Sequence, residues 1–166
     1  LAFPDGLIIY GAIPDKSLRQ IERQGKPIVR VDTLQKNNHC ININDKQGAF
    51  LIANHAFSNS LCENKQIDVA VLGLKLVEST RVCRLQNEDL DIQYQEISHN
   101  RLLGYIQAAD TNKVELSIDR VWNVPINDTK NATIAAREAL TASPIPKVLL
   151  CMSDIIALAA MKVAKE

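Results

Sequence analysis

Short apolar runs alternate along the chain with longer segments of helical period, and this alternation constrains the fold more than any other feature. The segments expected to be strands are residues 6–10, 27–31, 39–43, 67–74 and 147–152, and residues 114–124 are expected to be extended. Between them, apolar residues recur three and four positions apart, as in helices with one buried face. Parallel strands covered by helices on both faces give this pattern. The sequence therefore predicts an α/β fold with parallel sheets flanked by helices.

Capping residues and glycines bound the expected helices. One helix is expected to begin near Asp15 and to stop at Gly25, and another to begin at Asn44 or Asp45. The remaining helices are expected over residues 98–109, with Ser98 as a candidate N-cap, over 128–140, and over 154–165, with Ser153 as N-cap. Residues 75–97 receive no assignment because charges interrupt their apolar residues. The last helix is apolar on most of its circumference, so we expect it to face a sheet on one side and a partner subunit on another.

Composition excludes several classes of protein. Apolar residues make up 46% of the chain, which is typical of a soluble folded domain. The 19 basic and 19 acidic residues cancel, so this segment lacks the net positive charge that would hold a phosphate backbone. No apolar run approaches the ~20 residues of a membrane span, and the first residues lack the features of a signal peptide. We therefore expect a cytoplasmic protein that does not contact DNA through this segment.

No motif in the sequence indicates a metal, a cofactor or an enzyme. The cysteines stand at 40, 62, 83 and 151 without a C-x-x-C pair, which favours structural thiols over metal or disulfide roles. The histidines at 39, 55 and 99 share no ligand-like spacing with them. The phosphate-binding glycine motifs and the G-x-S-x-G nucleophile elbow do not occur. We expect no cofactor, no catalytic residue and no metal site.

Polar residues near the ends of buried strands are the candidate ligand contacts, because ligands of open parallel sheets bind at that edge. Asp45 opens a helix and is either a first-turn carboxylate or a ligand contact. Arg101 is placed either to hold adjacent hydroxyls or a carboxylate, or to form a salt bridge. Ser153 and Asp154 follow a strand, where each can cap the next helix or contact a ligand. Trp122, the only tryptophan, either stacks on a sugar or packs in the interior.

Motifs in the first half of the chain resemble those of the lactose and galactose repressor (LacI/GalR) family. D-G-L-I-I at residues 5–9 resembles the family's D-G-[IL]-I strand, and P-I-V-R-V-D at 27–32 resembles P-[VI]-V-x-[VI]-D. I-N-D-K-Q-G-A at 43–49 resembles V-x-x-D-x-x-x-G-A.

The second half continues the family's order of motifs. V-A-V-L-G at 69–73 matches a strand, and S-H-N-R-L-L-G-Y at 98–105 resembles S-x-x-R-x-x-G-[FY]. V-L-L-C-M-S-D-I-I-A-L-A-A at 148–160 resembles the family's strand, its N-D-x-[ML]-A motif and the helix after it. The match therefore runs across most of the chain.

This resemblance implies two similar lobes of the type I periplasmic-binding-protein kind around a cleft. Residues 1–62 would belong to the N-terminal lobe, 63–66 to a crossover, and 67–166 to the C-terminal lobe. By similarity Arg101 is the arginine that grips the ligand, Asp45 is a polar contact from the first lobe, and Ser153 stands where the family usually has an asparagine that contacts the effector. Asp154 and Trp122 complete the expected ligand-binding residues.

The chain departs from the family pattern at several points. Ser153 has a shorter reach than asparagine, and Leu61-Cys62-Glu63 replaces L-G-H. Residues 74–97 exceed the usual connection, which leaves Arg81 as a rival for the arginine role. The family's helix-turn-helix, hinge helix and first βαβ unit would precede residue 5, and a G-[FY]-D-D strand would follow the last helix. We therefore expect a domain that is incomplete at both ends.

The resemblance implies an effector-sensing domain of a homodimeric transcription repressor. It would bind a small molecule and couple this binding to operator DNA held by an absent N-terminal domain. The expected small molecule is a sugar, and a purine or a phosphorylated metabolite is left open. A single cleft arginine favours a neutral ligand. The alternative is a periplasmic-type sugar-binding protein for transport or chemotaxis; an enzyme of Rossmann-like architecture would need a phosphate loop or a reactive pair.

Overall fold

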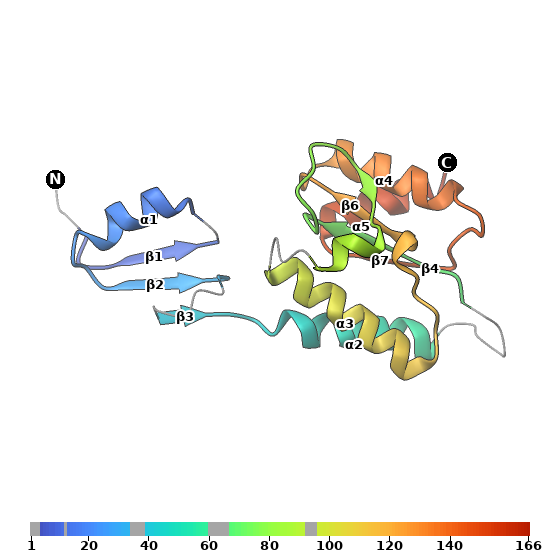
Figure 1. Ribbon diagram of the computed structural model, residues 1–166, viewed down its shortest axis with the longest axis horizontal. Helices are drawn as coiled ribbons and strands as arrows, with labels where there is room; N and C mark the ends of the chain where they lie inside the picture. The colour runs from blue at the N-terminus through green and yellow to red at the C-terminus, as the bar shows by residue number, and fades with distance from the viewer. Residues whose placement is uncertain (1–3, 12, 34–38, 60–66, 92–95) are drawn as a thin grey trace. The chain divides into compact units, whose positions relative to one another are not determined.

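The computed structural model describes residues 4–11, 13–33, 39–59, 67–91 and 96–166, and the structural statements below concern these residues. They form two compact units, Leu1–Asn44 and Asp45–Glu166, which are described separately (Figure 1). No helix in the described ranges is long and apolar enough to cross a lipid bilayer.

The first unit is a three-stranded parallel sheet with one described helix. Its elements are β1 (Leu7–Tyr10), α1 (Asp15–Glu22), β2 (Ile28–Val31) and β3 (His39–Ile41), and the strand order is β1-β2-β3. Ile9 of β1 and Leu18 of α1 are buried. The strand β3 ends before the predicted residue 43, at Ile41, which pairs with the last residue of β2, Val31. Directly after it, the Asn42 side chain accepts from the Thr33 N–H at 2.9 Å and donates to the Thr33 carbonyl at 2.8 Å. The three strands predicted for this region are confirmed, each slightly shorter than its apolar run.

The second unit is a four-stranded sheet between two layers of helices. Its strands are β4 (Val69–Leu74), β5 (Cys83–Arg84), β6 (Val121–Val124) and β7 (Val148–Cys151), in the order β5-β6-β4-β7. The strands β6, β4 and β7 are parallel, and β5 is an antiparallel edge strand. The helices are α2 (Asp45–Asn59), α3 (Glu96–Asn112), α4 (Thr129–Thr141) and α5 (Asp154–Val163), with short 3-10 turns η1 (Asn87–Asp91) and η2 (Ile118–Arg120).

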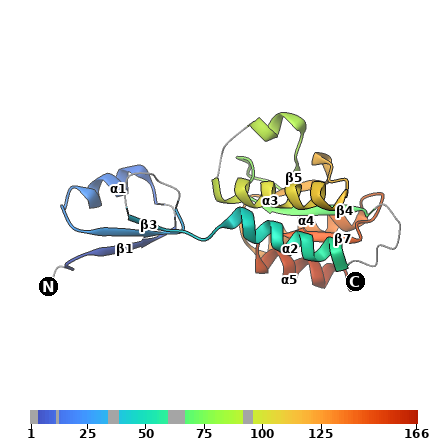
Figure 2. The same ribbon diagram turned by 90° about the horizontal axis from the view of Figure 1, so that it is seen from below.

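Successive residues of β4 point to opposite faces of this sheet, and each face has its own core. Val69 and Val71 pack with the side chains of α2 and α3. Ala70 and Leu72 pack with the alanines of α4 and the inner face of α5. The helices α2 and α3 lie side by side along their length (Figures 1 and 2). The α/β class with a helix-covered parallel sheet is therefore confirmed.

The structure differs from the sequence prediction in several elements. Residues 75–97, left unassigned, contain the edge strand β5 and the turn η1. Of the expected extended run 114–124, only Val121–Val124 is a strand, and η2 precedes it. The helix α3 already includes Glu96, so Ser98 lies inside its first turn, buried, and the prediction that Ser98 is the N-cap is wrong.

The two compact units meet at Asn44 and Asp45, and the lobe bounds 1–62, 63–66 and 67–166 stay a prediction. The expected crossover at 63–66 lies outside the described residues. The helix α2, expected in the first lobe with Asp45, packs on α3 and belongs to the second unit. Its residues Ala49, Ala53 and Phe57 are buried in the core formed with α3. The apolar face of α2 packs on α3, and this tertiary contact, which the local sequence does not reveal, places α2 in the second unit.

Candidate functional site

Arg101 links three elements at the carboxyl edge of the second unit's sheet. Its Nε donates a hydrogen bond to Asp45 Oδ1 at 2.7 Å, and its Nη1 donates to the backbone carbonyl of Met152 at 2.9 Å. The Arg101 side chain is 28% exposed and that of Asp45 only 7%. The guanidinium therefore joins the first turn of α2, the helix α3 and the end of β7, and part of it stays open to solvent.

A close crossing of α2 and α3 sets this geometry. Gly104 lies one turn after Arg101, and a Cβ on it would come within 2.3 Å of the Lys46 carbonyl oxygen and 2.8 Å of the Ala49 Cβ. Only glycine permits this approach, which places the first turn of α2 beside Arg101. The Asp45 carboxylate also lies where the partial positive charge of the α2 N-terminus stabilises an anion.

Tyr105, one helical turn from Arg101, adds a second bond to the same strand end. Its hydroxyl donates to the backbone carbonyl of Cys151 at 3.3 Å. Burial, with Cys151 nearby, raises the pKa of Tyr105 to about 12 against a smaller lowering by Arg101. Burial raises the pKa of the Cys151 thiol to about 11. Both groups are therefore protonated at neutral pH, so Cys151 is not an activated nucleophile.

Ser153 and Asp154 lie at the N-terminus of α5, directly after β7. The Ser153 Oγ accepts from the Ile156 N–H at 3.2 Å, which confirms Ser153 as the N-cap, and donates to Asn127 Oδ1 at 2.7 Å. The Asp154 carboxylate accepts from the N–H of Ile155. Asn127, in the connection from β6 to α4, was missed by the sequence analysis. Its position after a buried strand, which was the criterion applied to Ser153, would have found it.

Trp122 is fully buried and faces α4, on the opposite side of the sheet from α3. Its indole N–H donates to Glu138 Oε2 at 3.1 Å, and the guanidinium carbons of Arg84 and Arg120 lie 4.7 and 5.8 Å from the ring centroid. The structure therefore does not bring Trp122 together with Arg101. These contacts fit the packing role, and the sugar-stacking role stays a prediction that no contact supports.

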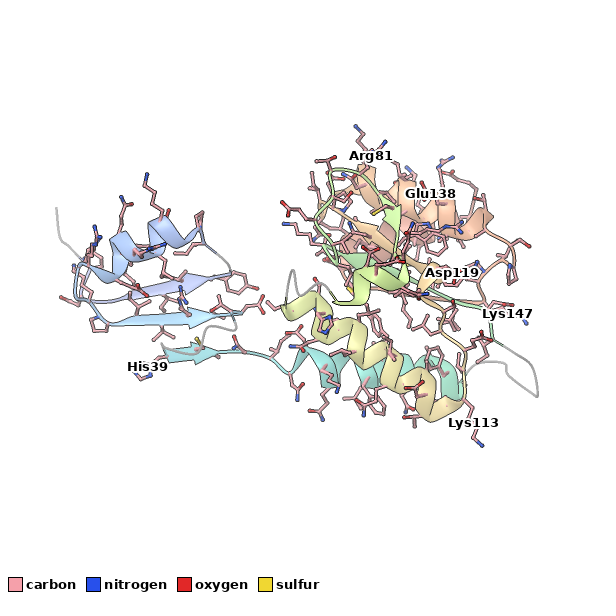
Figure 3. All side chains as sticks on the ribbon, in the orientation of Figure 1. His39, Arg81, Lys113, Asp119, Glu138 and Lys147 are labelled. Atoms are coloured by element: carbon pink, nitrogen blue, oxygen red, sulfur yellow. The ribbon has the colours of Figure 1, made fainter. Side chains whose placement is uncertain are left out.

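Arg81, the rival arginine, lies in the connection between β4 and β5. It is exposed, its backbone bonds to the Ser79 hydroxyl, and Figure 3 shows it at the outer side of the unit, away from α3. This connection is fixed instead by Asn123, a fully buried residue that sequence analysis did not single out. The Asn123 Oδ1 accepts from Leu76 N at 2.8 Å and Val77 N at 3.4 Å, and its Nδ2 donates to the Val77 carbonyl.

Solved structures share this arrangement of elements, whereas no protein-family model and no curated protein sequence matches the chain. A LacI-family transcriptional regulator from Corynebacterium glutamicum aligns with a TM-score of 0.80 and 18% identity, covering 97% of this chain and 47% of that one. The chain shares the fold of LacI-family regulators. It spans about half the length of these proteins, as the coverage shows.

Two further neighbours were solved with small molecules. The Cra transcriptional dual regulator from Pseudomonas putida, in complex with fructose 1-phosphate, aligns with a TM-score of 0.71 and 14% identity over 97% of this chain and 52% of that one. A sugar-binding LacI-family regulator from Escherichia coli, complexed with phosphate, aligns with a TM-score of 0.68 and 19% identity, covering 97% of this chain and 51% of that one. The periplasmic-binding-protein-like fold expected from the sequence is therefore confirmed.

Proposed function

We propose that this chain is the effector-sensing part of a DNA-binding transcription regulator and that it binds a small uncharged polyol, such as a sugar, at Arg101 and Asp45. The observation that carries the proposal is the Arg101 guanidinium, held by Asp45 and the Met152 carbonyl at the edge where parallel sheets bind ligands. The shared fold of solved regulators supports the same role. No reaction is proposed.

The donor set favours a neutral ligand over a phosphate ester. The Asp45 carboxylate compensates the Arg101 charge at 2.7 Å, so the pair as a whole is neutral. The pair still offers guanidinium N–H groups as donors and the second carboxylate oxygen as an acceptor, which suits a ligand with adjacent hydroxyls. A phosphate ester would place its charge next to Asp45 and would need further cations. The chain would therefore differ in ligand charge from the Cra neighbour, which was solved with fructose 1-phosphate.

Ser153 and Asp154 are proposed as secondary contacts from the end of β7, with Asn127 beside them. The Ser153 hydroxyl is shorter than the asparagine side chain expected at this position. We therefore propose that a ligand hydroxyl binds to the hydrogen-bonded pair of Ser153 and Asn127. Trp122 is left out of the proposed site because it packs against α4 on the other face.

Effector binding would act on operator DNA through parts of a longer homodimeric protein. A coupling of about 1–3 kcal/mol between the effector and operator sites changes operator affinity roughly 5- to 150-fold. Such a change is sufficient for induction or corepression.

The test is thermal unfolding and calorimetry of the full-length protein with neutral sugars, nucleosides and sugar phosphates, each added singly. A ligand at 100 times its Kd stabilises the folded state by about 2.7 kcal/mol. We expect a neutral polyol to bind and Arg101→Lys, which keeps the charge but loses the planar fork, to weaken binding about tenfold or more. The matched control is Arg81→Lys, which should leave binding unchanged.

Binding that survives in Arg101→Lys, or a folded protein that binds nothing in the panel, would remove the proposed site. Preferential binding of the sugar phosphates would leave the proposed location at Arg101 and Asp45 standing but would overturn the proposal that the ligand is neutral. A sugar that binds without altering the protein's affinity for any DNA sequence would point to the transport or chemotaxis alternative.

A further inference from the structure

A polar pocket of about 310 Å³ lies on the second unit away from Arg101. Residues that precede β4 and β6 form its walls, together with the end of the antiparallel strand β5 and the connection from α4 to β7. The polar residues that line it are Asp68, Arg84, Glu115, Ser117, Asp119, Arg120 and Ser143. Figure 3 labels Asp119 in the segment that enters β6. The pocket is at the amino edge of the parallel strands, whereas Arg101 contacts the carboxyl end of β7.

The two arginines of this pocket are held in place by contacts within the unit. Arg84 opposes Trp122 across the β5–β6 pair, and its guanidinium carbon lies 4.7 Å from the ring centroid. Arg120 lies 5.8 Å from the same ring and donates from Nη2 to the Pro144 carbonyl at 2.6 Å. A guanidinium that stacks on an aromatic face keeps its in-plane N–H groups available for a carboxylate. Both cations are therefore positioned before any ligand arrives, which reduces the entropy lost on binding.

The carboxylates of Asp68, Glu115 and Asp119 line the same pocket. A purely anionic ligand would be repelled by these carboxylates, and a purely cationic one by the two guanidinium groups. A small molecule with one ammonium and one carboxylate group satisfies both sets of charges. The volume is at the small end of the range for ligand pockets, which limits the ligand to a small molecule.

We propose that this pocket binds a small zwitterion of the α-amino acid type, with its carboxylate toward Arg84 and Arg120 and its ammonium toward Asp68 and Asp119. The site is separate from the polyol site and does not depend on it. It would give the regulator a second input from a different chemical class.

Trp122 provides one readout, because both pocket arginines lie over its ring. The full-length protein is titrated with each of the common α-amino acids singly, with putrescine as a cation and with acetate as an anion. Tryptophan fluorescence and calorimetry are recorded together. We expect at least one amino acid to give a saturable fluorescence change with a matching calorimetric Kd, and putrescine and acetate to bind at least about tenfold more weakly.

The variants Asp119→Asn and Arg84→Gln each remove one charge of the pocket and are expected to raise that Kd about tenfold or more. Asp110→Asn, an exposed carboxylate on α3 outside the pocket, is the matched control and should not change it. Arg101→Lys should also leave it unchanged, which separates this site from the polyol site. No saturable binding, equal binding of putrescine or acetate, or binding that is unaffected in both pocket variants would overturn the proposal.

Discussion

The sheets of the two units come from the same kind of sequence but are buried to different degrees. In the second unit, Val69–Leu72 of β4 and Val121–Val124 of β6 are at most 2% exposed. In the first unit, Ile8 and Tyr10 of β1 are 79% and 77% exposed, while Ile9 between them is buried. A continuous apolar run therefore identifies a strand, but whether both of its faces are covered depends on the helices that pack there.

The two units also differ in how their helix N-termini are capped. In the second unit, Asp128 caps α4 and Ser153 caps α5 through side-chain bonds to backbone N–H groups. In the first unit, α1 follows Pro14 and has no side-chain cap bond. The second unit therefore has more of the local interactions that fix a helix end, in addition to its larger core.

The largest effect is expected on the free energy of unfolding, when a buried isoleucine is replaced rather than an exposed one. Ile156→Ala removes a fully buried side chain of α5 from the core under α4, and we expect a loss of about 3 kcal/mol. Ile8→Ala removes a side chain that is 79% exposed, and we expect a change within about 0.5 kcal/mol. Denaturant titration followed by Trp122 fluorescence measures the first, and hydrogen exchange of the β1 and β2 amides measures the second. A cost for Ile8→Ala close to that of Ile156→Ala would show that the exposed face of β1 is covered in solution.

A smaller effect is expected at the crossing of α2 and α3. Gly104→Ala would force a Cβ to 2.3 Å from the Lys46 carbonyl oxygen, so the helices must separate, at a cost of about 2 kcal/mol. Gly48→Ala, in α2 with nothing within 4 Å of the added Cβ, is the control and should stabilise the unit by about 0.5–1 kcal/mol. Thermal unfolding of both variants gives the comparison. A stabilising Gly104→Ala would contradict the close crossing and the placement of Asp45 beside Arg101.

The smallest effect concerns the cap of α4 and its pH dependence. The Asp128 carboxylate accepts hydrogen bonds from the backbone N–H and from the side-chain amide of Asn131. These bonds, the backbone one most, lower the pKa of Asp128 below its usual 3.8. Because the folded-state pKa is lowered, the stabilisation is present above about pH 4 and is lost as the pH falls through the folded-state value. Asp128→Asn keeps a capping side chain without the charge. We expect wild type to be the more stable at neutral pH and the difference to shrink below pH 4.

Unfolding midpoints measured from pH 7 downward test this expectation, with Asp110→Asn as the control for an uncapped carboxylate. A difference between wild type and Asp128→Asn that is the same at every pH would mean that the charge of Asp128 does not stabilise α4.

Part of the candidate site was predictable because its signals are local. The Ser153 cap follows from a serine between a strand and an apolar helix, and Asp45 from a carboxylate at a helix start. The family motifs singled out Arg101, and the structure pairs it with Asp45. The position of Asn127 after a buried strand is a local signal, but the bonds of Tyr105 to Cys151 and of Asn127 to Ser153 are not, because they join residues 46 and 26 positions apart.

The sequence by itself determined the α/β class, the positions of most strands and helices, and the polar residues at strand ends, since apolar periodicity and capping depend on neighbouring residues. Tertiary structure alone decided that α2 packs with the second unit, that Asn123 fixes the connection after β4, and that Trp122 is buried under two arginines. These outcomes depend on which surfaces meet, and the free energy of such contacts comes from residues far apart in the chain.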